Sequence, residues 1–504
     1  MKKPPDSLLN FTLAFISAGL LILVFPNLIF PTFGEAWLAP LALTPLLLAL
    51  AREPRPWLRF LLGEFAGIVY WFGVCYWIQF VLEVHGGMGR WGGWATFMLF
   101  CVAKAIHLGV FSMLAAVLFQ TSYAAPAMAA LWTGIERTHG TFGFAWLALG
   151  DAGIDMALPL RVAPILGVYG LSFIFALTAA IIALLILRRG RKELWWLAVI
   201  PAVLLLPDLP APETPTRTAL VIQPNMPEAE QWTPATAAAA RDHLVALSLG
   251  SAVHAGAELV IWPEMPGPLY YYHDPEFHEE ATNLARTTQD YFLFGTVADT
   301  PRGAPLNSAV LLRPDGDVVD RYDKINLVPF GEFVPKFFSF VNRITQEAGD
   351  FAPGNRIVVF PVNDHRLGVF ICYESVFPAE VRQFVKGGAN LLVNISNDGY
   401  FGQSAAREQH LEIARMRAVE NRRWLIRSTN DGITAVIDPA GRVTKRLPMY
   451  QEAVAKIGYE YTAGTTVYTE RGDWFAWGCC LAAAVALFSS QRPHYTPRKR
   501  LKRS

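Results

Sequence analysis

The sequence predicts a bundle of about eight membrane-spanning α-helices with an α/β domain inserted before the last helix. Of the 504 residues, 53% are hydrophobic and 17% are charged, whereas soluble domains contain about 25% charged residues. Long apolar runs fill the first 207 residues, and a helix needs roughly 20 such residues to cross a bilayer. From residue 217 onward, short β-rich runs alternate with helical patterns, which is typical of a layered α/β domain.

The apolar runs predict the individual spans. They lie near residues 8–25, 34–51, 58–82, 95–119, 122–138, 163–187, 193–207 and 473–489. Because further spans follow the first, we do not interpret it as a cleavable signal peptide. The predicted organisation is a bundle of seven spans at 1–207, a Pro-rich linker at 208–216, an α/β domain at 217–465, an eighth span at 473–489 and a basic tail at 490–504.

The distribution of basic residues predicts the orientation, because short cytoplasmic loops are enriched in Lys and Arg. With eight spans, the basic clusters at 2–3, 52–59, 188–192 and 492–503 all fall on one side of the membrane. Both termini are then cytoplasmic, and the α/β domain lies outside the cytoplasm. The formal net charge of +1 gives no indication of a nucleic-acid partner.

Nine β-rich runs predict the strands of the α/β domain, and several are continuously apolar, as strands buried on both faces are. These runs are 219–223, 258–264, 291–296, 308–313, 356–360, 367–374, 389–396, 424–428 and 433–438. Helical patterns at 233–255, 275–289 and 405–422 separate some of them. About 250 residues are ample for one such core.

One cysteine, Cys372, falls in the α/β domain, whereas the other four lie in apolar spans. It ends an apolar run and precedes polar residues, and strand ends are where α/β folds position reactive groups. The alternative is a buried structural cysteine. No Cys/His spacing indicates a metal site, and we expect no cofactor.

Glu264 and Lys324 are candidate partners of Cys372. Glu264 ends an apolar run and has prolines on both sides, and Lys324 precedes an apolar run with a Pro-Phe-Gly turn. Taken alone, each side chain is better explained as a solvated or capping residue. A carboxylate, an ammonium and a thiol together supply a base, an oxyanion partner and a nucleophile for acyl chemistry.

The segments around these residues, taken in order, resemble the nitrilase superfamily, whose members carry a Glu-Lys-Cys triad in an α-β-β-α sandwich. With the membrane spans included, nearly the whole chain is similar to the apolipoprotein N-acyltransferase family. The matching segments are WPE at 262–264, LVPFGEFVP at 327–335, ICYES at 371–375, NISNDGYFG at 394–402, QHLEIARMRAVENRR at 409–423 and RSTNDGITAVIDPAGRV at 427–443.

The resemblance implies an enzyme of bacterial lipoprotein maturation. Members of the family take the sn-1 acyl chain from a phospholipid, usually phosphatidylethanolamine, and hold it as a cysteine thioester. They then transfer it to the α-amino group of the diacylglyceryl-cysteine that begins an apolipoprotein. The implied location is the bacterial inner membrane, with the catalytic domain on the periplasmic side, and the implied state is a monomer.

The resemblance also implies residue roles: Cys372 is the nucleophile, Glu264 the general base and Lys324 the oxyanion stabiliser. Residues expected to support the site are Glu332, Tyr373 and Glu374, with Trp232 matched by position alone as a substrate-binding residue. The chain departs from the usual family pattern at Met265, Pro266, Asn326 and Tyr400. None of these is a triad residue, so the departures concern the shape of the acyl pocket.

Two other functions are compatible with parts of the sequence. A membrane-anchored carbon–nitrogen hydrolase of the amidase type would use the same triad with water as the acceptor, but the spans favour a lipid substrate. A transporter or assembly factor would need intramembrane polar groups and paired repeats; Glu64 is the plainest acidic residue in a span.

Lys104 and His107 lie in the fourth span, where we interpret them as snorkelling or paired within the bundle. The aromatic-rich loop 336–352 is a candidate for contact with the lipid interface, or it packs on its own domain.

Overall fold

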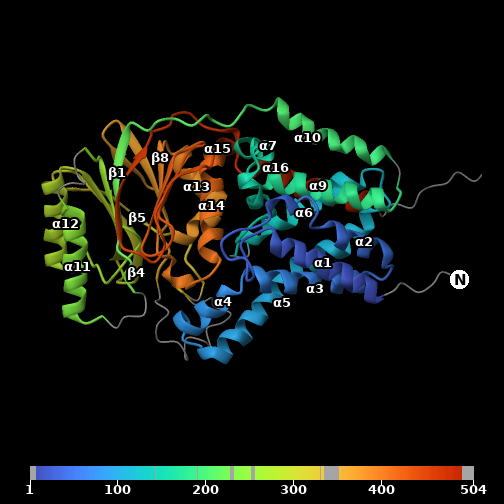
Figure 1. The fold of residues 1–504 in the computed structure, drawn as a ribbon, viewed down its shortest axis with the longest axis horizontal. Coiled ribbons are helices and arrows are strands. Elements are labelled where there is room, and N and C mark those ends of the chain that lie inside the picture. The colour runs from blue at the N-terminus through green and yellow to red at the C-terminus, as the bar shows by residue number, and fades with distance from the viewer. Residues whose placement is uncertain are drawn as a thin grey trace, which may run out of the picture.

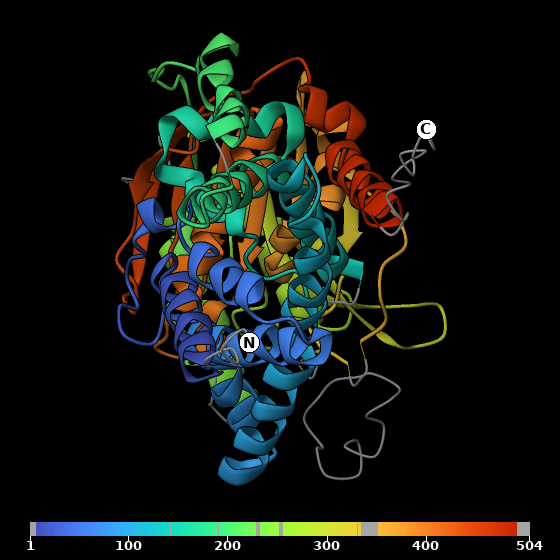
Figure 2. The ribbon, with the colours of Figure 1, turned by 90° about the vertical axis from the view of Figure 1, so that its right-hand side faces the viewer.

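The computed structural model describes residues 7–141, 144–189, 191–227, 232–250, 256–329, 331–333 and 351–490. The chain forms a helical bundle and an α/β sandwich that lie against each other, on the right and left of Figure 1. Figure 2 views the bundle from its outer side and shows the last helix, in red, beside teal helices from the first half of the chain. The basic tail after residue 490 and most of the loop 336–352 lie outside the described residues.

The bundle consists of apolar helices, as the composition predicts. Its main helices are α1 (Ser7–Leu23), α2 (Thr44–Arg52), α3 (Pro56–Val74), α5 (Gly89–Leu118), α6 (Ala124–Thr141), α9 (Val168–Ile186) and α16 (Trp474–Ser490). By length and composition, α3, α5 and α9 are long and apolar enough to cross a membrane, and α1 and α16 are shorter apolar helices. The expected membrane-protein class is therefore confirmed at the level of several apolar helices.

Two observed helical segments differ from the predicted spans. The predicted span 193–207 corresponds to a shorter apolar helical stretch, Glu193–Leu205, which consists of η4 (Arg191–Ala198), α10 (Val199–Ala202) and η5 (Val203–Leu205) in succession. Pro201 lies within this stretch and removes a backbone donor from a helix interior. The predicted span 58–82 divides after α3, and the chain continues as α4 (Trp77–Phe80) and the π-helical turn Val81–His85.

The sandwich contains two six-stranded sheets. The first has the order β12-β1-β2-β3-β4-β5 and the second β11-β10-β9-β8-β7-β6. Strands β1–β2–β3 and β7–β8–β9 pair in parallel, and the outer strands pair antiparallel. The first sheet comprises β1 (Arg217–Gln223), β2 (Leu259–Ile261), β3 (Tyr291–Asp299), β4 (Pro305–Leu312), β5 (Val318–Asp323) and β12 (Ala453–Tyr459). The second comprises β6 (Val359–Val362), β7 (His365–Ile371), β8 (Leu391–Ser396), β9 (Leu425–Thr429), β10 (Ala435–Ile437) and β11 (Val443–Arg446).

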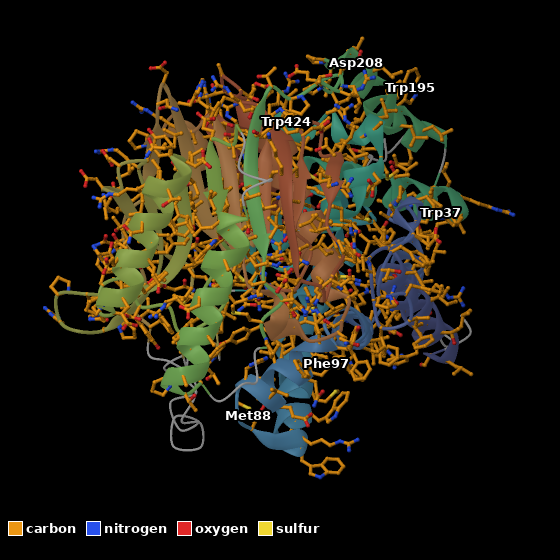
Figure 3. All side chains as sticks on the ribbon, turned by 60° about the vertical axis from the view of Figure 1, so that its left-hand side comes forward. Trp37, Met88, Phe97, Trp195, Asp208 and Trp424 are labelled. Carbon is orange, nitrogen blue, oxygen red and sulfur yellow. The ribbon has the colours of Figure 1, made fainter. Side chains whose placement is uncertain are left out.

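Helices cover the outer face of each sheet, which gives the expected α-β-β-α layers. In Figure 1, α11 (Pro234–Leu249) and α12 (Pro275–Thr288) cover the first sheet, and α13 (Pro378–Lys386) and α14 (Ala406–Asn421) lie beside the second. Every residue of β2 and β8 is buried, as expected for parallel strands between two layers. Figure 3 shows Trp424, which precedes β9, among the strands. Its side chain is 1% exposed.

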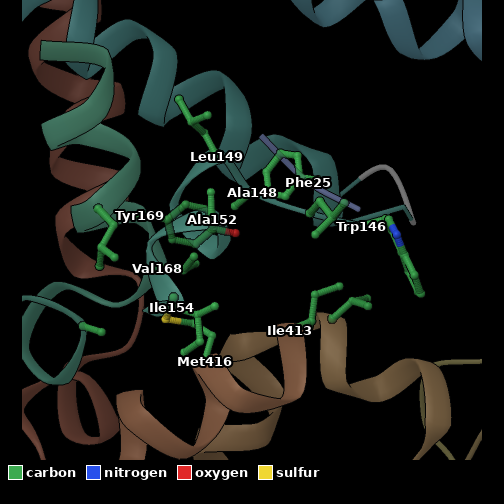
Figure 4. Packing of buried hydrophobic residues seen from close by; sticks show 14 of the residues in the cluster. Phe25, Trp146, Ala148, Leu149, Ala152, Ile154, Val168, Tyr169, Ile413 and Met416 are labelled. Atoms are coloured by element: carbon green, nitrogen blue, oxygen red, sulfur yellow. The ribbon is translucent and has the colours of Figure 1, made fainter. Parts of the chain in front are cut away.

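Helix α14 joins the sandwich to the bundle, and 14 of its 16 residues are buried. Figure 4 shows Ile413 and Met416 of this helix pointing toward Ile154 and Val168 of the bundle. Gln409 is fully buried at the same interface. Its amide oxygen accepts hydrogen bonds from the indoles of Trp146 at 2.7 Å and Trp77 at 3.2 Å, and its amide nitrogen donates to the carbonyls of Pro26 at 2.6 Å and Val74 at 3.0 Å. The Gln409 side chain therefore hydrogen-bonds to three segments of the bundle, at Pro26, at 74–77 and at Trp146.

Candidate active site

The three candidate catalytic residues come from the two facing sheets and line one cavity. Glu264 follows β2 by three residues, Lys324 follows β5 directly, and Cys372 follows β7 directly. The cavity has a volume of about 1400 Å³, and all three residues line it. The strand ends predicted from the sequence are thus brought together at one edge of the sandwich.

Glu264 is held by three hydrogen bonds, and its side chain is almost fully buried. Its Oε1 accepts from Lys324 Nζ at 3.0 Å and from Asn307 Nδ2 at 2.7 Å, and its Oε2 accepts from the backbone N–H of Asn397 at 2.9 Å. Gly295 of β3 lies against its backbone, where an added Cβ would meet Glu264 Cα at 2.9 Å. The carboxylate is therefore fixed in orientation, as a general base must be.

Lys324 is 1% exposed and lies between two carboxylates. Its Nζ is 3.0 Å from Glu264 Oε1 and 3.0 Å from Glu332 Oε1. Burial alone lowers the pKa of this ammonium, but the two carboxylates outweigh burial and raise the pKa well above its ordinary value. Lys324 is therefore positively charged at neutral pH and has the charge required to stabilise an oxyanion.

Glu332 belongs to the same hydrogen-bond network. Its Oε1 also accepts from Asn307 Nδ2 at 2.6 Å, and its Oε2 accepts from the backbone N–H of Val328 at 2.8 Å. Asn307 thus donates to both carboxylates that contact Lys324. The sequence does not single out Asn307, because polar residues near the start of the otherwise apolar strand β4 have no local signature.

Cys372 has a strained backbone and a protonated thiol. Its φ of +50° lies in the left-handed region, which costs a non-glycine residue about 1–2 kcal/mol. The Nε2 of His410 is 3.1 Å from its carbonyl oxygen. Burial, and next the carboxylate of Glu264, raise the pKa of the thiol above its ordinary value, although Lys324 acts in the opposite direction. The thiol therefore keeps its proton at rest and must transfer it to a base in order to attack.

A buried chain of polar groups from the second sheet supports His410. Asp398 Oδ1 lies 2.9 Å from Ser396 Oγ, 2.7 Å from Arg427 Nη2 and 3.1 Å from His410 Nδ1. Burial opposes the charge on Asp398, but Arg427 and His410 hold its pKa well below its ordinary value. Burial and the nearby Arg427 lower the pKa of His410, and the hydrogen bonds of its two ring nitrogens, to Asp398 Oδ1 and to the Cys372 carbonyl, act in the opposite direction. No local pattern in the sequence indicates this chain of contacts.

Tyr373 and Glu374 follow Cys372 and have different surroundings. Tyr373 lines the cavity, and its ring stacks on Trp146 of the bundle with centroids 6.4 Å apart. Glu374 is fully buried, and it accepts from Tyr322 Oη at 2.7 Å, from Ile325 N at 2.6 Å and from Ile371 N at 2.7 Å. Glu374 therefore joins the nucleophile turn to the Lys324 segment without lining the cavity.

Glu380 of α13 was not identified from the sequence. Burial and the neighbouring Glu374 raise its pKa to about 10, so its carboxyl group is neutral at neutral pH. Asn326, one of the departures from the family pattern, donates a hydrogen bond to Glu380. The pair therefore forms part of the support behind the Lys324 segment.

The rest of the cavity wall is mostly apolar and comes from both the bundle and the sandwich. It includes Leu99, Phe100 and Ala103 of α5 and the aromatic rings of Trp77 and Phe144. Further lining residues are Trp232, Met265, Pro266 and Tyr400. The wall thus includes Trp232, which was matched to a substrate-binding residue of the family by position alone. It also includes Met265, Pro266 and Tyr400, three of the four positions where the chain departs from the family pattern. Within the described ranges, no three His, Cys, Asp or Glu side chains are grouped so as to hold a metal ion.

Both parts of the chain match family models. The sandwich matches the model described as carbon-nitrogen hydrolase over residues 218–464, and the bundle matches the apolipoprotein N-acyltransferase N-terminal domain over residues 17–181. An apolipoprotein N-acyltransferase of Geobacter metallireducens is 35% identical, covering 94% of each chain. One of Ralstonia nicotianae is 31% identical and covers 90% of each chain. An amidase from Nesterenkonia sp. of solved structure is 16% identical, with a TM-score of 0.39, over 53% of this chain and 97% of that chain.

Proposed function

The chain belongs to the apolipoprotein N-acyltransferase family, and we propose that its active site uses Cys372 as nucleophile, Glu264 as general base and Lys324 as oxyanion partner. As a member of that family it is an acyltransferase of lipoprotein maturation and a membrane protein. The motif order in the sequence predicted this family, and the family matches confirm the prediction.

One observation carries the proposal for the site. The three residues line the same cavity as apolar side chains of α5 and α6, so a reactive centre and a bundle-lined apolar channel share one space. A fatty acyl chain gains about 0.8 kcal/mol for each CH₂ group that it buries. An apolar cavity next to the thiol therefore suits a substrate whose reactive ester is attached to such a chain.

In the first step, Glu264 takes the proton of the Cys372 thiol as the sulfur attacks the ester carbonyl of the donor lipid. The negative charge on the tetrahedral intermediate is stabilised by the Lys324 ammonium. The C–O bond then breaks, and the proton on Glu264 passes to the departing alcohol of the lysophospholipid. The acyl group remains on the sulfur as a thioester.

In the second step, the α-amino group of the acceptor attacks the thioester carbonyl and Glu264 takes a proton from the amine. The C–S bond breaks, the sulfur leaves as a thiolate that regains a proton from Glu264, and an amide forms. The two steps share one nucleophile, so the kinetics should be ping-pong. The raised pKa of the resting thiol supports a base-assisted attack in the first step.

The donor is a glycerophospholipid, with phosphatidylethanolamine the expected head group, and the acceptor is a diacylglyceryl apolipoprotein. The basic clusters at 52–59 and 188–192 support an orientation with both termini in the cytoplasm. The sandwich then lies on the periplasmic side of the bacterial inner membrane, and the enzyme acts as a monomer. The match of the bundle to the acyltransferase model disfavours a simple carbon–nitrogen hydrolase.

A two-substrate assay tests the proposal. Purified protein in detergent, incubated with acyl-labelled phospholipid and a diacylglyceryl-cysteine peptide, should produce labelled N-acyl peptide. Cys372→Ala and Glu264→Gln should each abolish most of this product. Release of labelled fatty acid without amide would indicate a hydrolase and would overturn the assignment.

A further inference from the structure

A buried lysine of the bundle, Lys104 of α5, lines the same cavity as the triad and has no role in the mechanism above. Its side chain is 6% exposed. Its Nζ donates to the backbone carbonyl of Phe144 at 2.7 Å and lies 5.3 Å and 5.5 Å from the ring centroids of Trp71 and Phe144. Burial disfavours the charge on this side chain, whereas the aromatic faces and the Phe144 carbonyl favour it, and the amino group borders the cavity.

The surroundings of Lys104 differ from those of Lys324. Two carboxylates contact the Lys324 ammonium at 3.0 Å. Among the described residues, by contrast, no Asp or Glu oxygen lies within 4.0 Å of Lys104 Nζ. A buried charge is costly unless it is paired, and an ammonium has three donors. The described contacts of Lys104 therefore lack the anion that a buried ammonium requires.

Lys104 lies at the end of the bundle that faces the sandwich. Trp71 is three residues before the end of α3, and Phe144 follows the end of α6 by three residues. His107, one turn after Lys104, lies with its ring 4.3 Å from that of His139 in the last turn of α6. In Figure 3, Phe97 and Met88 continue α5 beyond this level, below the sandwich. Lys104 is therefore level with the ends of α3 and α6 that lie nearest the sandwich.

A short path connects Lys104 with the nucleophile. Phe144 contacts the ammonium, and its ring centroid lies 6.4 Å from that of Trp146, two residues further on. Trp146 in turn stacks on Tyr373, the residue after Cys372. In a glycerophospholipid, a phosphodiester lies a few bonds from the sn-1 ester. Lys104 and Cys372 line the same cavity, so the ester and the phosphate of one bound lipid occupy the space that both residues border.

We propose that Lys104 binds the phosphate group of the phospholipid donor and positions the sn-1 ester at Cys372. This inference rests on the proposed function, and it adds a binding residue that the triad does not supply. Lysine binds phosphate as a point charge with several donors, and the apolar wall around it strengthens the attraction. The contact with the Phe144 carbonyl orients the ammonium toward the cavity.

The test compares donors with and without phosphate. Acylation of Cys372 is measured by mass spectrometry with phosphatidylethanolamine and with a p-nitrophenyl acyl ester, which lacks phosphate. Lys104→Gln keeps a donor for the Phe144 carbonyl but removes the charge, and Lys104→Arg keeps the charge. Arg90→Gln removes an exposed cation from the same helix and serves as the matched control.

The measured quantity is the ratio of kcat/KM for phospholipid to kcat/KM for the ester. In Lys104→Gln this ratio should fall by about 10- to 100-fold, because one charge-assisted hydrogen bond to the phosphate is lost. Lys104→Arg should recover most of the ratio. A proportional loss with both donors would indicate a structural role and would overturn the inference. Wild-type protein that acylates Cys372 with neither donor would overturn the proposed function itself.

A second measurement needs no variant. Wild-type protein should prefer phosphatidylethanolamine over a diacylglycerol with the same chains by about 10- to 100-fold in kcat/KM. Equal rates for the two donors would contradict a phosphate-binding role for Lys104, even if Lys104→Gln proved too unstable to assay.

Discussion

Gln409 should control the alignment of the sandwich with the bundle. Gln409→Met preserves the length and approximate volume of the side chain, so it leaves no large cavity. It removes all four hydrogen bonds that Gln409 makes to Trp77, Trp146, Pro26 and Val74. The substitution therefore separates the polar contacts at this interface from its packing.

The loss of stability in Gln409→Met follows from the two buried indole N–H groups that the substitution leaves without an acceptor. The indole N–H groups of Trp77 and Trp146 lie in buried side chains, 5% and 0% exposed. A buried donor without an acceptor costs about 1–3 kcal/mol, so the two indoles together cost about 2–6 kcal/mol. Trp77 and Trp146 belong to the wall beside the nucleophile, and a displacement near 1 Å can reduce turnover by about 100-fold.

The assay measures acyl transfer from phospholipid, the thermal midpoint in detergent and the rate at which iodoacetamide alkylates Cys372. Gln409→Met should lower the midpoint by several degrees and reduce transfer by roughly 10- to 100-fold. Alkylation should change by less than about threefold, because the triad contacts lie within the sandwich and its own loops. Gln383→Met on α13 is the control, since Gln383 bonds to a carbonyl of its own helix.

Two results would contradict a role for Gln409 in aligning the sandwich with the bundle. If Gln409→Met matched Gln383→Met in midpoint and transfer rate, the four hydrogen bonds would have no role in holding the two parts together. If alkylation fell in parallel with transfer, Gln409 would act on the nucleophile itself through the neighbouring His410, and alignment of the cavity halves would not be the cause.

Three further predictions concern charge. Because burial and Glu264 raise the pKa of Cys372, its alkylation rate should rise with pH without a plateau near neutrality, and a plateau near pH 7 would contradict this. Glu332→Gln removes one of two carboxylates from Lys324, so kcat/KM for acyl transfer should fall about 10- to 100-fold; unchanged kinetics would contradict a supporting role. The folded-state pKa of Glu380 is about 10, above its ordinary 4.5, so the folded state keeps a proton that the unfolded chain loses. Stability should therefore fall as pH rises between these values, and Glu380→Gln should flatten that dependence in denaturation curves; an unaltered slope would count against the raised pKa.

The sequence predicted the features that are encoded locally. Apolar runs identified the parallel strands at the centre of both sheets, because these strands are buried on both faces. Strands β5, β11 and β12 were missed, because each lies at the edge of its sheet and carries exposed side chains. The predicted span 193–207 appears as the shorter apolar helical stretch Glu193–Leu205, in which the type of helix changes along the chain.

The triad segments were found because each follows a strand or turn with a local pattern. The residues that support the site through hydrogen bonds were not predicted, because their contacts join distant parts of the chain. Gln409 bonds to residues 332 and 263 positions away, and His410 reaches the Cys372 carbonyl across 38. Which buried polar groups meet is decided by tertiary packing, and a single sequence does not display that packing.

Mass spectrometry of the protein after exposure to phospholipid alone tests whether Cys372 carries the acyl group as a thioester. We expect one added acyl group on the peptide containing Cys372, removable by hydroxylamine, absent in Cys372→Ala and strongly reduced in Glu264→Gln. Formation of the N-acyl product without any adduct on Cys372, or an adduct on another cysteine, would contradict it.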